Sequence, residues 1–236
     1  MQNLENIIKA VKDCIFPVFC LNCKKEGQWL CLDCFIKIEA NGEEFCPICH
    51  KYNKNGAVCL ECKSQSFLDS HLAIIKYEED KLVGDLIHNF KYNYAEEIFG
   101  IFIKIITDYL SQNFYYFKDI DFIAPVPLHG RRLAERGFNQ AELIADTIAR
   151  IIGKKVENKI IFRHRYTGIQ ARLNKLDRIC NVDGAFAMNN NEIMVKDKNI
   201  LLVDDIFTTG STLQECAKLL KINGAKKVLG FTLARG

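Results

Sequence analysis

From Leu72 onward, apolar residues follow strand-like and helix-like spacing in turn. Short apolar runs predict strands over 72–77, 122–126, 200–203 and 227–233, whereas apolar positions three and four apart predict helices over 81–90, 95–112, 139–152 and 211–222. Asn223-Gly224 after the last helix is a typical helix stop. Strands that alternate with helices in this way are typical of an α/β fold with a parallel sheet.

The first 66 residues differ from the rest of the chain. One periodic segment opens them, with Leu4, Ile7, Ile8 and Val11 at helical spacing, and four C-x2-C pairs follow. We therefore predict two domains. Residues 1–66 would form an N-terminal helix and a cysteine-rich unit, and residues 67–236 would form the α/β domain.

The four cysteine pairs predict two metal sites, because two C-x2-C turns together supply the four thiolates that tetrahedral zinc prefers. Sequential pairing gives one ion Cys20, Cys23, Cys31 and Cys34 and the other ion Cys46, Cys49, Cys59 and Cys62. An interleaved pairing, first with third and second with fourth, is the alternative. Structural zinc is favoured over redox-active pairs or an iron–sulfur cluster, since a segment with few apolar residues needs metal to fold. His50, beside Cys49, is interpreted as a solvent-facing residue, with ligand replacement as the alternative.

The segment LLVDDIFTTGST, residues 201–212, predicts a ligand site. In an open parallel sheet, ligands bind at the carboxyl ends of strands, and here an apolar strand is predicted to end at the carboxylates Asp204 and Asp205. The loop after them offers hydroxyls and backbone N–H groups to a phosphate, from Thr208, Thr209, Gly210, Ser211 and Thr212. Carboxylates accept hydrogen bonds from ribose hydroxyls and can hold Mg2+, which suggests a ribose 5-phosphate site. The alternative is that the two acids only stabilise the N-terminus of the following helix and bind no ligand.

Composition and charge narrow the class of protein. The chain has 236 residues, of which 49% are hydrophobic, so a disordered chain is excluded. The formal net charge is only +3, but residues 131–178 hold twelve Lys or Arg and five acidic residues, a local charge of about +7. That stretch favours a polyanionic partner, either a diphosphate or a nucleic acid.

No segment predicts export or a membrane span. Charged residues interrupt the first 14 positions, and Lys104 and Asp108 interrupt the longest apolar stretch, residues 98–110. A bilayer span needs about 18 or more apolar residues. We therefore expect a cytoplasmic protein, in which reduced thiols bind metal instead of forming disulfides.

The segment LLVDDIFTTGST closely resembles the phosphoribosyl pyrophosphate signature of type I phosphoribosyltransferases. Together with VPLHGRRLAERGFNQAELIA at 126–145, RHRYTGIQARLNKLDRICNVDGAF at 163–186 and the cysteine pairs, it resembles the ComF family of competence proteins, known for DNA uptake in natural transformation. The resemblance covers nearly the whole chain. It implies a type I phosphoribosyltransferase-like parallel sheet flanked by helices, preceded by a small cysteine-rich double zinc ribbon.

The resemblance also implies phosphoribosyl pyrophosphate with Mg2+ as the ligand. The ribose would bind Asp204 and Asp205, and the 5-phosphate would bind residues 208–212. The pyrophosphate would face the loop after the strand at 122–126, which contains Pro127, His129, Arg131 and Arg132. Residues 163–178 resemble the mobile hood of these enzymes, with Arg165, Thr167 and Gln170 as the matching positions.

Three functions are compatible with this sequence. The first is binding of single-stranded DNA, to which we expect Arg131, Arg132, Arg136, Arg163 and Arg165 to contribute. The second is phosphoribosyl transfer to an unidentified acceptor, although residues 231–236, which match the segment that reads the base in purine-using relatives, leave little chain for an acceptor pocket. The third is docking of a helicase or translocase on the zinc ribbons, with Trp29 as an anchor.

Overall fold

A five-stranded parallel sheet forms the centre of the computed structural model, which describes residues 17–78, 81–92, 96–166, 182–189 and 195–236. The strand order is β1-β7-β6-β2-β3. The bounds are β1 (Ser70–Lys76), β2 (Phe122–Pro125), β3 (Lys155–Val156), β6 (Asn199–Phe207) and β7 (Lys227–Arg235). The predicted α/β fold with a parallel sheet is confirmed.

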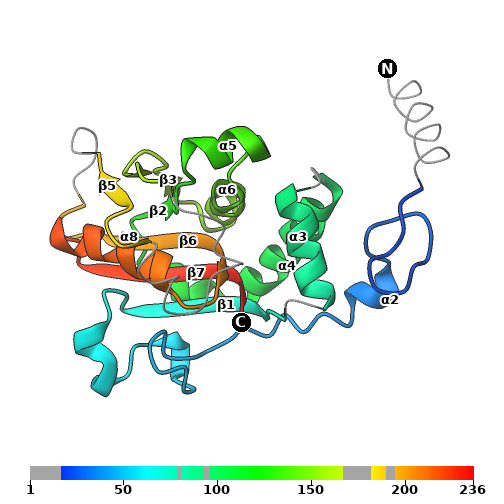
Figure 1. Cartoon of the computed structure of the whole chain (residues 1–236). Helices are drawn as coiled ribbons and strands as arrows, with labels where there is room; N and C mark the ends of the chain where they lie inside the picture. The colour runs from blue at the N-terminus through cyan, green and yellow to red at the C-terminus, as the bar shows by residue number, and fades with distance from the viewer. Residues whose placement is uncertain (1–16, 79–80, 93–95, 167–181, 190–194) are drawn as a thin grey trace.

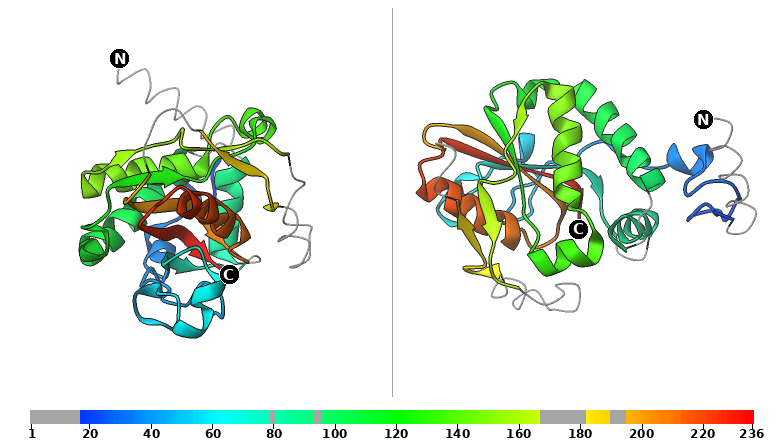
Figure 2. Two further views of the ribbon diagram at one scale, coloured as in Figure 1. Left: turned by 90° about the vertical axis from the view of Figure 1, so that its left-hand side faces the viewer. Right: turned by 90° about the horizontal axis from the view of Figure 1, so that it is seen from above.

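Helices cover both faces of the sheet (Figures 1 and 2). The helices α3 (Leu82–Tyr92), α4 (Glu96–Asn113) and α6 (Gln140–Ile152) cover one face, and α8 (Ser211–Ile222) covers the other. Side chains of β6 alternate between the two layers. Leu201 and Val203 belong to the core on the α4 and α6 side, whereas Ile200 and Leu202 belong to the core on the α8 side. The central strand is therefore buried on both faces, as its unbroken apolar run predicts.

The strand β6 is longer than predicted. Its ladder with β7 continues past Val203 through the pairs Asp204↔Thr232, Ile206↔Ala234 and Phe207↔Arg235. The expectation that the strand ends before the two aspartates is therefore wrong. Both acids therefore lie within the last part of a strand that pairs with β7, and not in a loop.

The chain contains elements that the sequence pattern did not predict. A short helix, α5 (Gly130–Arg136), follows β2, and an antiparallel hairpin joins β4 (Ile161–Arg163) to β5 (Phe186–Met188). The hairpin lies outside the main sheet, and α8 packs against its second strand. Residues 167–181 of the expected hood lie outside the described residues, as does the helix expected at residues 4–11.

The cysteine-rich region forms two lobes that lie apart (Figure 1). The first lobe, residues 17–40, contains α2 (Leu32–Phe35) and lies beside α4, where Lys104 Nζ is 5.2 Å from the centre of the Phe35 ring. Trp29 packs, partly buried, against the core on this side, so it is less available as an anchor for a partner than expected.

The second lobe, residues 43–65, contains the 3-10 helices η1 (Lys54–Gly56) and η2 (Leu60–Gln65) and lies along the edge strand β1. Isolated bridges join Glu43 to Ala73 and Ala57 to Ser70. The Tyr116 hydroxyl, in the 3-10 helix η3 (Phe114–Phe117), donates to Glu44 Oε1 at 2.8 Å. The second lobe thus contacts the sheet directly, and the domain boundary near residue 66 stays a prediction.

Within the described residues, every helix is too short or too polar to cross a bilayer.

Candidate functional site

A pocket of about 190 Å3 opens where β2 and β6 end and α8 begins. The predicted ligand residues that line it are Pro127, Arg132, Asp204, Asp205, Thr208, Thr209, Gly210, Ser211 and Thr212. Residues that the sequence did not single out also line it, among them Tyr77, Lys91, Asn139 and Gln140. The position agrees with the rule that open parallel sheets bind ligands at the carboxyl ends of their strands.

The two carboxylates in the pocket have different environments. Asp205 Oδ2 lies 2.7 Å from Lys91 Nζ, and the two side chains are only 13% and 19% exposed. Asp204 Oδ1 accepts a hydrogen bond from the backbone N–H of Asp205 at 2.9 Å. Removal from water, and to a lesser extent the charge of Asp205, raises the pKa of Asp204 to about 7. Asp205 is therefore paired with a lysine, and Asp204 changes charge near neutral pH.

The loop between β6 and α8 has a geometry that requires glycine. Gly210 has a φ of +72°, and a Cβ at this position would lie 2.5 Å from the Phe207 ring. Gly210 is also the N-cap of α8 and has no side chain with which to cap it, and the first turn of the helix contains no acid. The backbone N–H of Ser211 donates to Thr209 Oγ1 at 3.4 Å. Thr209 Oγ1 and Ser211 Oγ lie 3.0 Å apart beside these groups. Hydroxyls and backbone N–H groups are the donors that a phosphate needs.

Three arginines line the pocket: Arg132, Arg136 and Arg163. Arg136 donates to Gln140 Oε1 at 3.1 Å and to the Tyr92 hydroxyl at 3.2 Å. Arg163 lies over the Phe186 ring at 5.0 Å, and its burial lowers the pKa of its guanidinium. The cations thus face the pocket from α5 and from the hairpin.

Three other predicted residues do not line this pocket. His129 is the N-cap of α5 and accepts through Nδ1 from the backbone N–H of Arg131 at 3.2 Å. The guanidinium of Arg131 lies over the Tyr166 ring at 5.3 Å, and Arg165 donates to the carbonyl of Asp183. Thr167 and Gln170 lie outside the described residues.

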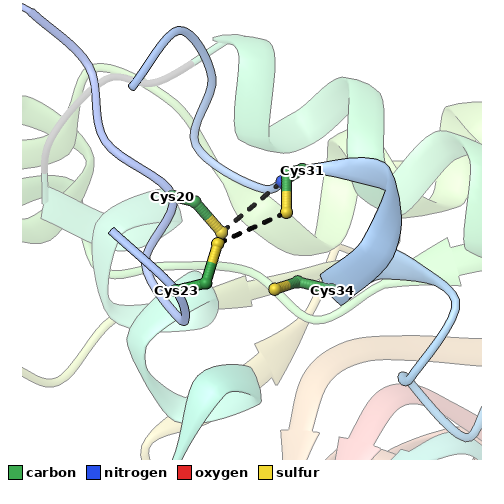
Figure 3. Close-up of side chains that lie close together, drawn as sticks. All are labelled: Cys20, Cys23, Cys31 and Cys34. Carbon is green, nitrogen blue, oxygen red and sulfur yellow. Dashed lines mark hydrogen bonds between the residues drawn. The ribbon is translucent and has the colours of Figure 1, made fainter. Parts of the chain in front are cut away.

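The eight cysteines form two clusters in sequential order. One contains Cys20, Cys23, Cys31 and Cys34 (Figure 3), and the other Cys46, Cys49, Cys59 and Cys62; within each, all sulfurs lie within 4.8 Å of one another. The Cys23–Cys31 and Cys49–Cys59 sulfur distances are 3.5 and 3.8 Å. A zinc tetrahedron with bonds of about 2.3 Å has edges of about 3.8 Å, so both clusters fit a double zinc ribbon. The interleaved pairing does not occur, and His50 belongs to neither cluster.

Comparison with known proteins identifies the family. A model of the phosphoribosyl transferase domain matches residues 96–235. Competence protein ComFC of Streptococcus pneumoniae is 30% identical over 90% of this chain and 90% of its own length. This chain belongs to the ComF family. Competence protein F of Haemophilus influenzae is 29% identical over 87% of this chain, and the DNA utilization protein YhgH of Salmonella typhimurium is 33% identical over 64% of it.

Two pocket residues of this ComF-family protein lie outside the matched domain. Tyr77 follows β1, and Lys91 is near the end of α3, both before residue 96. Neither belongs to a recognisable motif, and the Lys91–Asp205 ion pair joins distant parts of the sequence. Lys91 reaches the pocket through the packing of α3, and Tyr77 reaches it through its position after β1, so sequence reasoning did not find them.

Proposed function

We propose that this ComF-family protein acts in DNA uptake, binding phosphoribosyl pyrophosphate with Mg2+ in its pocket and single-stranded DNA along the pocket rim. One observation supports this most directly. The acid pair (Asp204 and Asp205), the loop at residues 208–212, which we call the phosphate loop, and three arginines converge on one pocket. Relatives named for competence and DNA utilization support the biological setting.

The pocket chemistry matches each part of the ligand. Asp204 and Asp205 would accept hydrogen bonds from the ribose hydroxyls, and residues 208–212 would donate to the 5-phosphate. Arg132 and Arg163 would neutralise the diphosphate. Mg2+ binds through one or two carboxylates together with substrate phosphates, a donor set that the acid pair and a diphosphate would supply.

The surroundings of the pocket suit single-stranded nucleic acid because two arginines lie there over exposed residues. Tyr92 and Tyr166 are 51% and 39% exposed. Arg136 lies over the Tyr92 ring at 5.0 Å, and Arg131 lies over the Tyr166 ring. Stacking of bases on such rings and neutralisation of phosphates by arginine give binding without strong sequence preference. We therefore propose Arg131, Arg132, Arg136, Arg163 and Arg165 as DNA contacts.

For the cysteine clusters we propose structural zinc. Four thiolates per ion leave no open coordination position for catalysis, and the sulfur distances suit a four-coordinate ion. Docking of a helicase or translocase on these lobes stays a prediction.

Calorimetric titration of phosphoribosyl pyrophosphate with Mg2+ into the purified protein tests the proposal. We expect binding in the wild type and a loss of more than a hundredfold in Asp204→Asn with Asp205→Asn, since two charge-assisted hydrogen-bond positions disappear at about 1.5–3 kcal/mol each. Unchanged affinity in the double variant, with an intact circular dichroism spectrum, would show that the acids have no part in binding.

Phosphoribosyl transfer to an acceptor is the second candidate. The observation that favours it is Tyr77, which lines the pocket and whose backbone N–H donates to the carbonyl of Arg235. The segment after β1 would thus supply one wall of an acceptor site, since residues 231–236 are not among those that line the pocket. Release of pyrophosphate on addition of nucleobases, measured with a coupled assay, would support this candidate, and its absence with every base and with DNA would reject it.

A further inference from the structure

The aromatic residue that precedes the phosphate loop is enclosed on several sides. Phe207 is buried, and its ring centre lies 4.1 Å from that of His71 and 6.3 Å from that of His50. Gly210 lies against the same ring so closely that a Cβ would clash with it. The backbone carbonyl of Phe207 accepts from Gly236 N at 2.9 Å. The position of this ring therefore determines where the loop can lie.

Arg235 connects this ring to the second cysteine lobe. Its guanidinium lies 5.1 Å from the Phe207 ring centre and 4.9 Å from that of Phe45, and the residue is only 5% exposed. It donates to the carbonyl of Phe45 at 3.3 Å, to that of Cys46 at 3.5 Å and to His50 Nδ1 at 3.1 Å. Its hydrogen-bond partners are thus in the turn that presents Cys46 and Cys49, and one of its two ring partners, Phe207, is next to the phosphate loop.

We propose that Arg235 is a positioning residue that couples the second cysteine cluster to the phosphate loop, so that metal in this cluster strengthens binding of phosphoribosyl pyrophosphate. The identity of the ligand rests on the proposed function. The coupling between the cluster and the loop rests on the contacts of Arg235 alone. Neither the family match nor the names of the relatives assign a role to this contact.

The physical reason is the cost of an unpaired buried cation. The turn that contains Phe45 and Cys46 has few apolar contacts of its own, and metal–thiolate bonds would hold its carbonyls in place. Without them, the guanidinium would lose acceptors in a buried position, and it would have to move toward water. Phe207 would then lose a packing partner, and the loop that is held through Gly210 would become less ordered.

The test uses the full chain with Arg235→Met, which keeps much of the side-chain length but removes the charge and the donors. The matched control is Tyr116→Phe, which removes the hydrogen bonds from the Tyr116 hydroxyl to Glu44 and Asn55 of the same lobe but leaves Arg235 and its partners unchanged. A second variant, Cys46→Ser with Cys49→Ser, removes metal from this cluster alone. Each protein is measured by calorimetric titration of phosphoribosyl pyrophosphate with Mg2+, by metal analysis and by hydrogen exchange of the peptide that spans residues 203–213.

We expect about tenfold weaker binding and faster exchange of this peptide in both Arg235→Met and the double cysteine variant, with neither change in Tyr116→Phe. If Arg235→Met does not fold, faster exchange in the double cysteine variant alone supports the coupling. Exchange that is unchanged in both, or equally faster in Tyr116→Phe, would overturn it. The wild type could also fail to bind phosphoribosyl pyrophosphate while exchange is still faster in Arg235→Met and in the double cysteine variant. That result would support the coupling and reject the proposed ligand, so the two failures are distinguishable.

Discussion

Lys91 is the residue whose charge most directly controls the acid pair. Its ammonium group lies 2.7 Å from Asp205 Oδ2 in a mostly buried position. The same charge opposes the rise in the pKa of Asp204. Lys91 thus favours the ionised form of Asp204, the form that the proposed ligand needs.

We predict that Lys91→Met weakens binding of phosphoribosyl pyrophosphate more at low pH than at high pH. Without the ammonium group, Asp204 retains its proton to higher pH, so affinity should fall about tenfold at pH 6.5 and recover largely at pH 8.5. Titration calorimetry at both values measures this. Lys76→Met, which removes a largely exposed lysine near the end of β1, is the control. An equal loss at both pH values would mean that Lys91 contacts the ligand instead of tuning the acids.

Asp204 should reduce the stability of the folded protein at high pH. Its pKa is about 7 in the folded protein and 3.8 in its ordinary state, so the folded protein retains the proton over the range in which the unfolded chain releases it. Stability is therefore lost as pH rises from about 4 to about 7, and the cost is complete above pH 7. Asp204→Asn should raise Tm at pH 8.5 by a few degrees, with a smaller gain at pH 6. Calorimetric melting curves test this, and a gain independent of pH would contradict it.

At the scale of single elements, α5 places two arginines over exposed residues, Arg131 over the Tyr166 ring and Arg136 over the Tyr92 ring. We predict that Arg131→Ala and Arg136→Ala each lower the slope of log affinity for single-stranded DNA against log salt by about 0.7, the value for one phosphate contact. Fluorescence anisotropy with a labelled oligonucleotide at several salt concentrations measures the slope. Arg150→Ala, an exposed arginine of α6, is the control. DNA affinity that does not depend on salt would reject the proposed contacts.

Elements with a clear apolar period could be predicted from the sequence, and elements without one could not. The helix α8 was predicted at its observed bounds, since Leu213, Ala217 and Leu220 form a regular buried stripe. The helix α5, GRRLAER, has no buried residue and therefore no period to detect. The β4–β5 hairpin joins two three-residue strands separated by a long segment, which leaves no local turn signal.

From residue chemistry alone, the site could be predicted only where its residues are adjacent in the sequence, whereas Pro127 and Arg132 were predicted from the family resemblance. The acids and the phosphate loop form one continuous segment, so their types and order were informative. Lys91, Tyr77 and Arg235 reach the site or its support through tertiary packing, and no spacing rule connects them to it. The sequential grouping of the cysteines likewise needed the fold, because spacing allowed two pairings.

For the whole molecule, both cysteine lobes are joined to the α/β core, which determines what metal removal does. Cys20, Cys31 and Cys34 belong to the same buried cluster as residues of α4, and the second lobe bridges to β1. We predict two zinc ions per chain by elemental analysis of protein purified without added metal. Chelation should lower the unfolding temperature of the whole chain in one transition, since structural zinc contributes to folding. Iron with visible absorption, or one ion per chain, would contradict the assignment.

The strand order has a consequence for how the chain folds as the ribosome makes it. In the sheet, β7 lies between β1 and β6, yet it comes after both in the sequence. During synthesis, β1 therefore emerges without the neighbour that its backbone pairs with, and it must wait for residues 227–235. Pairings between such distant segments form slowly, and an unpaired apolar strand is prone to aggregate in the meantime. The second cysteine lobe bridges to β1 at Ala73 and Ser70 and is synthesised before it. A metal-bound lobe would therefore pair with β1 until β7 is made.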